Sequence, residues 1–182
     1  ACSDCGRPQN SSNFGGPGAQ PINGLTMGEM TTYINWVNSV LGNGHRLPSE
    51  AEWEFAATSR GTELLPWGMR EPTCDDVQAS ECGLETTPVC SKPGGNTVQG
   101  LCDMLGNLAE VLEDDYHATY DCSSDSTADG CNEASTAESQ TAPNDGSPWI
   151  NPAPRGNLRV KRGGSYNFSF QQINAKSRSS VD

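Results

Sequence analysis

Apolar residues recur at helical spacing early in the chain. Met27, Met30, Ile34, Val37 and Leu41 stand three or four positions apart, which places them on one face of a helix of about four turns. Such a helix would have a single apolar stripe. The start and end of this stripe are marked by Thr26 and Glu29, which form a capping box, and by Gly42 and Gly44.

A second helix is predicted after Pro48. Ser49 and Glu52 can cap each other's backbone amides, which marks the first turn, and Pro48 keeps the entering chain extended. Trp53 and Ala57 are four positions apart and therefore share a face. We expect this face to be buried.

The rest of the pattern is typical of loops and short strands. Residues 158–166 alternate in character, as a strand does. The 182 residues are only 34% hydrophobic and include 20 Gly and 12 Pro, so much of the chain must run as loop. With two helices, this composition predicts a loop-rich α+β fold with short antiparallel strands.

Two segments stand outside this pattern. Residues 1–19 are rich in glycine and polar residues, and we expect an extended N-terminal arm before a domain over residues 20–182. Residues 118–151 are rich in Ser, Thr, Asp, Gly and Pro, which predicts an insertion loop of low complexity without helix or strand.

Eight cysteines, an even number, favour disulfides over a zinc site, because no second C-x-x-C or histidine pair completes four ligands. They allow roughly a hundred connectivities, among which nearest-neighbour pairing would close each long loop locally. Disulfides imply an oxidising, extracytoplasmic compartment: the medium, the cell surface or the periplasm. The four pairs would be Cys2 with Cys5, Cys74 with Cys82, Cys90 with Cys102, and Cys122 with Cys131.

The charge balance narrows the choice of partners. The net charge of −12 argues against nucleic acid and anionic membranes, because both need clustered Lys and Arg, and it favours cations. No apolar run is long enough to cross a bilayer, so we expect no membrane span.

Residues 44–57 carry the most specific motif of the chain. Their sequence, G-H-R-L-P-S-E-A-E-W-E-F-A-A, resembles the hallmark of the formylglycine-generating enzymes, also called sulfatase-modifying factors. Further family motifs follow in order, including L-P-W-G at 65–68, G-L-C-D-M-L-G-N-L-A-E-V at 100–111 and R-V-K-R-G-G-S-Y at 159–166. The resemblance implies a scaffold similar to that of C-type lectins. The family's opening strands and closing G-F-R strand have no match, so we expect a processed or incomplete chain, or a partner that supplies these edges.

The copper chemistry of this family does not fit the sequence. The resemblance implies two cysteines that bind Cu(I) after the G-G-S-Y motif, and these positions hold Phe168 and Ile173, which offer no donor atom. Two tryptophans of the family fall on Ala109 and Val111. We therefore expect no copper and no formylglycine synthesis.

An iron site is equally unsupported. The related sulfoxide synthases of thiohistidine biosynthesis hold their metal with three histidines, whereas this chain has only His45 and His117. We expect both at the surface.

The resemblance also implies a calcium site, and its ligands are kept. Family members hold Ca²⁺ with two side chains and the intervening carbonyls of the G-N-x-W-E segment. By position the ligands are Asp103, Gly106, Leu108 and Glu110, an all-oxygen set that suits a hard cation. An ordinary tight turn with a solvated glutamate is the alternative. A second family site would lie near Asp76.

Two classes of function remain open. One is a formylglycine-generating oxidase that acts on a sulfatase cysteine; the other, which we favour, is a non-catalytic, calcium-stabilised binding or structural module. The resemblance includes ligand-binding proteins that vary the residues after the G-G-S-Y motif, here Tyr166, Asn167, Phe168 and Phe170. Aromatic and amide side chains suit contacts with a protein or glycan ligand. A self-assembling subunit of a surface filament or adhesin is a further alternative.

Overall fold

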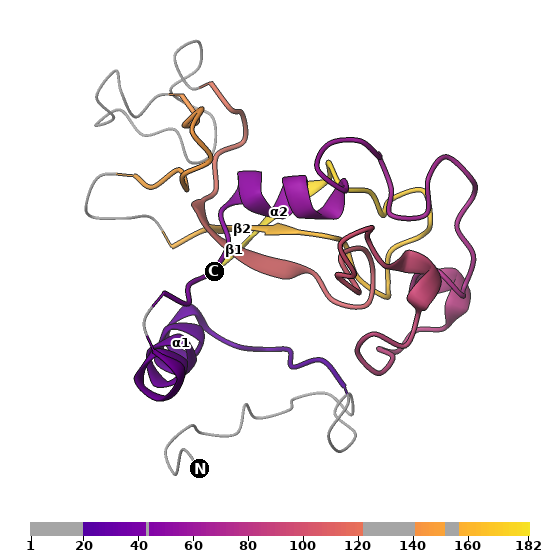
Figure 1. Cartoon of the computed structure of the whole chain (residues 1–182), viewed down its shortest axis with the longest axis horizontal. Helices are drawn as coiled ribbons and strands as arrows, with labels where there is room; N and C mark the ends of the chain where they lie inside the picture. The colour runs from indigo at the N-terminus through magenta and orange to yellow at the C-terminus, as the bar shows by residue number, and fades with distance from the viewer. Residues whose placement is uncertain (1–19, 43, 122–140, 152–156) are drawn as a thin grey trace.

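Two α-helices and a three-stranded sheet form most of the regular structure in the part of the chain that is described. The computed structural model describes residues 20–42, 44–121, 141–151 and 157–182. Long loops join the elements, which confirms the predicted loop-rich α+β class, and no helix within these ranges is long and apolar enough to cross a membrane. In chain order the elements are α1 (Met27–Leu41), α2 (Glu50–Ala57), the 3-10 helices η1 (Ser80–Cys82) and η2 (Pro93–Gly95), β1 (Glu110–Asp115), β2 (Arg159–Arg162) and β3 (Arg178–Val181) (Figure 1).

Both α-helices begin where the capping boxes predict. The Thr26 amide donates to Glu29 Oε2 at 2.8 Å, and the Glu29 amide donates to Thr26 Oγ1 at 3.3 Å. At α2 the Ser49 amide donates to Glu52 Oε2 at 2.8 Å, and the Glu52 amide donates to Ser49 Oγ at 3.1 Å. Arg46 adds two bonds to the Glu52 carboxylate, at 2.8 and 2.7 Å. Each first turn thus has partners for amides that the helix itself leaves unpaired.

The apolar stripe of α1 is only partly covered. Its predicted members are half-buried except for Leu41, which is 73% exposed, and no residue of the helix is fully buried. A second apolar row, formed by Tyr33, Trp36 and Val40, is exposed. In Figure 1, α1 lies apart from α2 and the sheet. The helix therefore owes little of its stability to the core.

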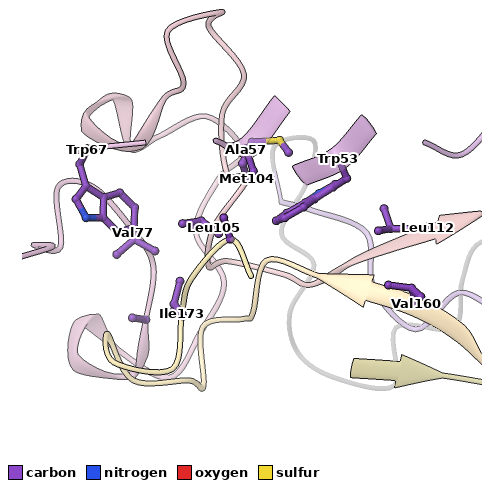
Figure 2. Packing of buried hydrophobic residues seen from close by; sticks show 11 residues of the cluster. Trp53, Ala57, Trp67, Val77, Met104, Leu105, Leu112, Val160 and Ile173 are labelled. Atoms are coloured by element: carbon purple, nitrogen blue, oxygen red, sulfur yellow. The ribbon is translucent and has the colours of Figure 1, made fainter. Parts of the chain in front are cut away.

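The core lies where α2, the sheet and the loops meet. Figure 2 shows Trp53 of α2 between the sheet residues Leu112 and Val160 on one side and Met104 and Leu105 of the loops on the other. Trp53 is 2% exposed, which confirms the predicted buried face of α2. The other buried members of the core are Ala57, Trp67, Val77, Ala79, Ile173 and Ala175.

The sheet has the order β1-β2-β3 with antiparallel pairing throughout. The sequence pattern did not predict β1, because four of its six residues are acidic. Asp114 is nevertheless buried, since its two carboxylate oxygens accept from the amides of Glu50 and Trp149 at 2.7 and 2.8 Å. Backbone amides thus replace the water that an acidic strand would otherwise need.

β2 is shorter than the strand predicted over residues 158–166. It ends at Arg162, because Gly163 and Gly164 adopt positive φ angles of 93° and 70°. A Cβ on Gly163 would lie 2.8 Å from Met104 O, so glycine is required where these two segments of the chain pack against each other. The residues after the G-G-S-Y motif consequently run as turns.

His45 is exposed, as expected, whereas the expectation of a surface position for His117 is wrong. His117 is 1% exposed. Its ring stacks on Trp149 with 3.6 Å between centroids, and its Nε2 lies 2.9 Å from Asn151 Oδ1. Residues 149 and 151, which the sequence assigned to the insertion loop, are themselves buried and cover the histidine.

Two of the four expected disulfides lie in the described ranges, and both are present. They join Cys74 to Cys82 and Cys90 to Cys102, with Cα atoms 5.4 and 5.1 Å apart. The local pairing is therefore confirmed where it can be seen. Outside the described residues lie the N-terminal arm predicted for residues 1–19 and the cysteines Cys2, Cys5, Cys122 and Cys131.

Candidate functional site

Residues 103–110 form the turn that leads into β1, and neighbouring loops fix its path. Asp103, Gly106 and Asn107 adopt positive φ angles of 55°, 75° and 58°. A Cβ at Gly106 would lie 2.5 Å from Gln78 O, so no other residue fits there. The turn therefore has a single backbone path, as a preorganised site requires.

Asn107 ties this turn to three other loops. Its side chain accepts from the Thr87 amide and donates to the Thr87 carbonyl, both at 3.1 Å. Its own amide donates to Gln78 O at 3.0 Å, and its carbonyl accepts from the Tyr166 amide at 2.9 Å. The buried Asn107 thus connects the candidate calcium turn to the candidate ligand stretch that begins at Tyr166.

The predicted calcium ligands Asp103 and Glu110 each have one engaged oxygen. Asp103 Oδ2 accepts from the Cys90 amide at 2.7 Å, and Glu110 Oε2 accepts from Trp53 Nε1 at 2.6 Å. Within the described ranges, neither carboxylate forms an ion pair with a basic side chain. The pKa of Glu110 is raised, first by burial and further by the negative charge of Asp103, although the Trp53 hydrogen bond opposes the change. A cation between the two carboxylates would relieve this repulsion.

The remaining predicted ligands are backbone carbonyls. No residue of the described ranges donates a hydrogen bond to the carbonyl oxygen of Gly106 or of Leu108. A cavity of about 430 Å³ opens beside Leu108 and has Asp103 and Glu110 in its wall. Carboxylates, carbonyls and room for water are what Ca²⁺ takes in proteins. The residues present therefore fit a calcium ion.

The positions that the family uses for copper do not fit that metal. A Cβ built on Gly164 would lie 3.5 Å from Phe168 Cδ2 and 3.1 Å from Ile173 Cγ1, so the two side chains converge on the same point. Ile173 is 3% exposed and belongs to the core. Cu(I) needs soft sulfur ligands, and these two side chains offer only carbon. Ala109 and Val111 stand at the tryptophan positions and line the cavity beside Leu108.

The four candidate ligand-binding residues are not equivalent. Phe168 is 39% exposed, and Asn167 is exposed with its Oδ1 accepting from Ser165 Oγ at 2.5 Å. Phe170 packs against the core, and Tyr166 is half-buried. The surface of this stretch is therefore formed mainly by Asn167 and Phe168.

Neighbouring residues fix the backbone of this stretch. The Ser80 amide of η1 donates to Phe168 O at 2.9 Å. The Phe170 amide donates to both carboxylate oxygens of Glu81 at 3.2 Å. η1 thus fixes the backbone that carries the exposed aromatic ring of Phe168.

Asp76, near the second family calcium site, already has a cationic partner. Arg70 donates to its Oδ2 at 2.6 Å, and the amide and hydroxyl of Thr73 donate at 2.9 and 2.8 Å. The Arg70 hydrogen bond is the main cause that holds the pKa of Asp76 well below its usual range. A Cβ on Gly95 would lie 1.9 Å from Asp76 O, so η2 packs directly on this residue. The guanidinium thus already neutralises the charge of Asp76.

Two contacts of the site could not be read from the sequence. Helical spacing places Trp53 in the core, but it does not show that its indole donates to Glu110, 57 positions further along. Nor does any motif show that the amide of Cys90 meets Asp103. A pattern predicts the buried face of an element, whereas the partner of each polar atom depends on how distant loops pack.

Comparisons with known proteins agree with the motifs. A family model, the sulfatase-modifying factor enzyme 1-like domain, matches residues 2–182. The formylglycine-generating enzyme of Streptomyces coelicolor is 32% identical over 179 residues, covering 88% of this chain and 46% of that protein. The serine/threonine-protein kinase Pkn1 of Chlamydia trachomatis is 39% identical over 104 residues, covering 56% of this chain and 14% of that protein. The chain thus spans less than half the length of either relative.

A solved structure supports the same fold. The structure of PvdO from Pseudomonas aeruginosa matches with a TM-score of 0.67 and 22% sequence identity. The match covers 92% of this chain and 64% of that one. At this identity the likeness concerns the fold alone.

Proposed function

Because the chain belongs to the sulfatase-modifying factor family, we propose that it uses the family scaffold as a non-catalytic binding module. In this proposal calcium stabilises the module, a protein or glycan ligand docks after the G-G-S-Y motif, and the chain works in an oxidising, extracytoplasmic compartment. The proposal does not include the oxidase activity of the longer formylglycine-generating enzyme, since the residues that would perform copper chemistry differ in this chain.

The observation that carries this proposal is that Phe168 and Ile173 occupy the two copper positions, both beside Gly164. A copper-dependent member needs a thiolate at both positions, and here an aromatic ring and a branched aliphatic side chain stand there instead. Ile173 also packs in the core, so the position serves stability. The four cysteines of the described ranges are bonded to each other in pairs and supply no thiolate.

The binding surface is supported by the exposure and the fixed backbone of Phe168. A rigid aromatic side chain buries a large contact area at a small cost in conformational entropy. η1 holds the backbone on either side of the ring through Ser80 and Glu81, so little order has to be gained on binding. Asn167 beside it can donate and accept hydrogen bonds.

Calcium is supported by the unneutralised pair Asp103 and Glu110 and by the open carbonyls of Gly106 and Leu108. When bound, the ion would supply charge neutralisation and fix the turn that enters β1. The compartment is supported by the disulfides Cys74–Cys82 and Cys90–Cys102, which persist in oxidising surroundings.

Incubation with Cu(I), oxygen and a peptide that carries the sulfatase cysteine motif tests the absence of catalysis. We expect no aldehyde product by mass spectrometry and no bound copper after desalting. The double variant Phe168→Cys/Ile173→Cys restores sulfur at both positions and should retain Cu(I). Aldehyde formation by the unchanged protein above a metal-free control would overturn the proposal.

Binding is tested on a glycan array and on a displayed peptide library. Ligands selected by the unchanged protein should lose affinity at least about tenfold with Phe168→Ala, because an aromatic anchor at the centre of a contact dominates its energy. Phe55→Ala is the matched control, since Phe55 is also exposed but lies on α2. Equal loss in both variants would place the ligand elsewhere.

A further inference from the structure

We infer that the Cys90–Cys102 disulfide positions Asp103 for cation binding, so that breaking this one disulfide weakens calcium affinity. The inference rests on the calcium site proposed above and adds to that site a part that supplies no ligand atom. It also separates the two described disulfides by role, since within the described ranges neither Cys74 nor Cys82 donates a hydrogen bond to a candidate calcium ligand.

The disulfide and the Asp103 carboxylate form one cluster. Cys102 directly precedes Asp103, and the Cys90 amide donates to Asp103 Oδ2. The sulfur atoms of Cys90 and Cys102 and a carboxylate oxygen of Asp103 all lie within 4.8 Å of one another. Because the sulfurs are bonded to each other, they act on a cation only by holding the carboxylate in place.

The two residues joined by the hydrogen bond from the Cys90 amide to Asp103 both have an unfavourable backbone conformation. Cys90 and Asp103 have φ angles of 58° and 55°, in the left-handed region that residues with a Cβ avoid. Such conformations persist only where the surroundings fix them. Without the bond between Cys90 and Cys102, Cys90 can return to an ordinary φ angle, and its amide then leaves Asp103.

The rest of the loop has its own anchors. η2, in its middle, packs on Asp76, and the Thr97 amide donates to Leu101 O at 2.9 Å. Within the described ranges, Cys90 itself is held by its disulfide and by the bond to Asp103, whereas its neighbours have bonds of their own, from the Ser91 amide to Pro88 O and from Lys92 Nζ to Cys74 O. Loss of the disulfide should therefore free the backbone of Cys90 itself and leave the rest of the loop packed.

The bond from the Cys90 amide is a hydrogen bond to a metal-ligating carboxylate. Such outer contacts orient the ligand, and their loss costs about 10–100-fold in metal affinity. Asp103 would keep its charge but lose its orientation toward Glu110. The expected change is therefore in affinity, with the ligand set unchanged.

Isothermal titration with CaCl₂ tests this on the whole chain. Cys90→Ala/Cys102→Ala should bind calcium at least about tenfold more weakly than the unchanged protein. Cys74→Ala/Cys82→Ala is the matched control, because that disulfide closes a similar loop and has the same exposure at both ends. Its affinity should change by less than about twofold.

A second measurement uses only the unchanged protein and so does not depend on the folding of a variant. A soluble phosphine reduces the disulfides, and alkylation with peptide mass spectrometry reports each cysteine separately. By linkage, saturating CaCl₂ should protect Cys90–Cys102 and leave Cys74–Cys82 unaffected. If the unchanged protein binds no calcium, the proposed calcium site fails; if it binds calcium but neither the affinity nor the protection depends on Cys90–Cys102, this inference fails.

Discussion

Asp76 is a buried carboxylate that pairs with the Arg70 guanidinium and also accepts hydrogen bonds from Thr73. It is almost fully buried, and its partner Arg70 is half-exposed. A buried charge without a partner is costly, so the pair matters more for what its loss would leave behind than for its own attraction. Because η2 packs directly on Asp76, the cost would fall on the loops that surround the calcium candidate.

Arg70→Met should lower the free energy of unfolding by about 1–3 kcal/mol at neutral pH, because it leaves Asp76 charged and unpaired. Arg70 lowers the pKa of Asp76, so its contribution is fully present above the usual value of 3.8 and is lost as the pH falls through the folded-state value. Urea unfolding at a series of pH values should show a difference that shrinks below about pH 3.8. Arg60→Met, at an exposed position, is the control, and a difference that persists unchanged into acid would contradict this account.

The start of α2 combines a capping box with an ion pair. Glu52 caps the Ser49 amide while it binds Arg46, and hydrogen bonds from Arg46 and Ser49 lower its pKa from 4.5 to about 2. Glu52→Ala should destabilise the protein by about 1 kcal/mol at pH 7. Since the pKa is depressed, this contribution is fully present above pH 4.5 and disappears as the pH falls through about 2. Thermal unfolding should be compared at pH 7 and at about pH 2, with Glu63→Ala as the control variant. A destabilisation by Glu52→Ala that is the same at both pH values would contradict this account.

Replacing glycine by alanine should have opposite effects on stability at two positions, Gly95 and Gly28. A Cβ on Gly95 in η2 would meet Asp76 O at 1.9 Å, whereas a Cβ on Gly28 in α1 would meet only Thr26 Oγ1 at 3.9 Å. Gly95→Ala should cost about 3 kcal/mol or more, because backbone must move. Gly28→Ala should add about 0.5–1 kcal/mol, because alanine favours helix. Denaturant unfolding measures both, and a tolerated Gly95→Ala would show that η2 does not press on Asp76.

Calcium should stabilise the whole molecule through the turn before β1. At a calcium concentration about a hundred times the dissociation constant, the Tm of the unchanged protein should exceed its Tm in chelator by roughly 5–10 °C. Asp103→Asn keeps the acceptor for the Cys90 amide but removes the charge, so most of this difference should disappear. Asp75→Asn, at an exposed position, should retain it. A Tm that chelator leaves unchanged in the unmutated protein would make the turn an ordinary one.

Much of this architecture could be predicted because its signals are local. The capping boxes at Thr26 and Ser49 place the helix starts, and the spacing of Trp53 and Ala57 identifies a buried face. Cysteine pairing in the described ranges also follows sequence proximity. β1 could not be predicted in this way, because its buried Asp114 is satisfied by the amides of Glu50 in α2 and of Trp149, far away in the chain.

For the candidate site, too, the sequence predicts individual residues but not the contacts between them. Motif positions indicate Asp103 and Glu110, and they also show that Phe168 and Ile173 offer no sulfur. They do not show that Trp53 and Cys90 donate to the two carboxylates, or that Arg70 pairs with Asp76. These contacts are side-chain to backbone or side-chain to side-chain bonds, and no periodic pattern of residues indicates them.

The partly covered α1 has a consequence for the order in which the molecule opens. A helix of 15 residues without a fully buried residue is held mainly by its own backbone bonds and its cap, so it can unfold while the sheet stays intact. Deuterium uptake should therefore be fast and nearly independent of urea for the amides of α1, and slow and urea-dependent for those of β2. Calcium should slow uptake around Glu110 and leave α1 unchanged. The protein would then consist of two cooperative units. One is α1, which opens and closes on its own. The other includes the core, the stretch after the G-G-S-Y motif and the turn over residues 103–110, which unfold together.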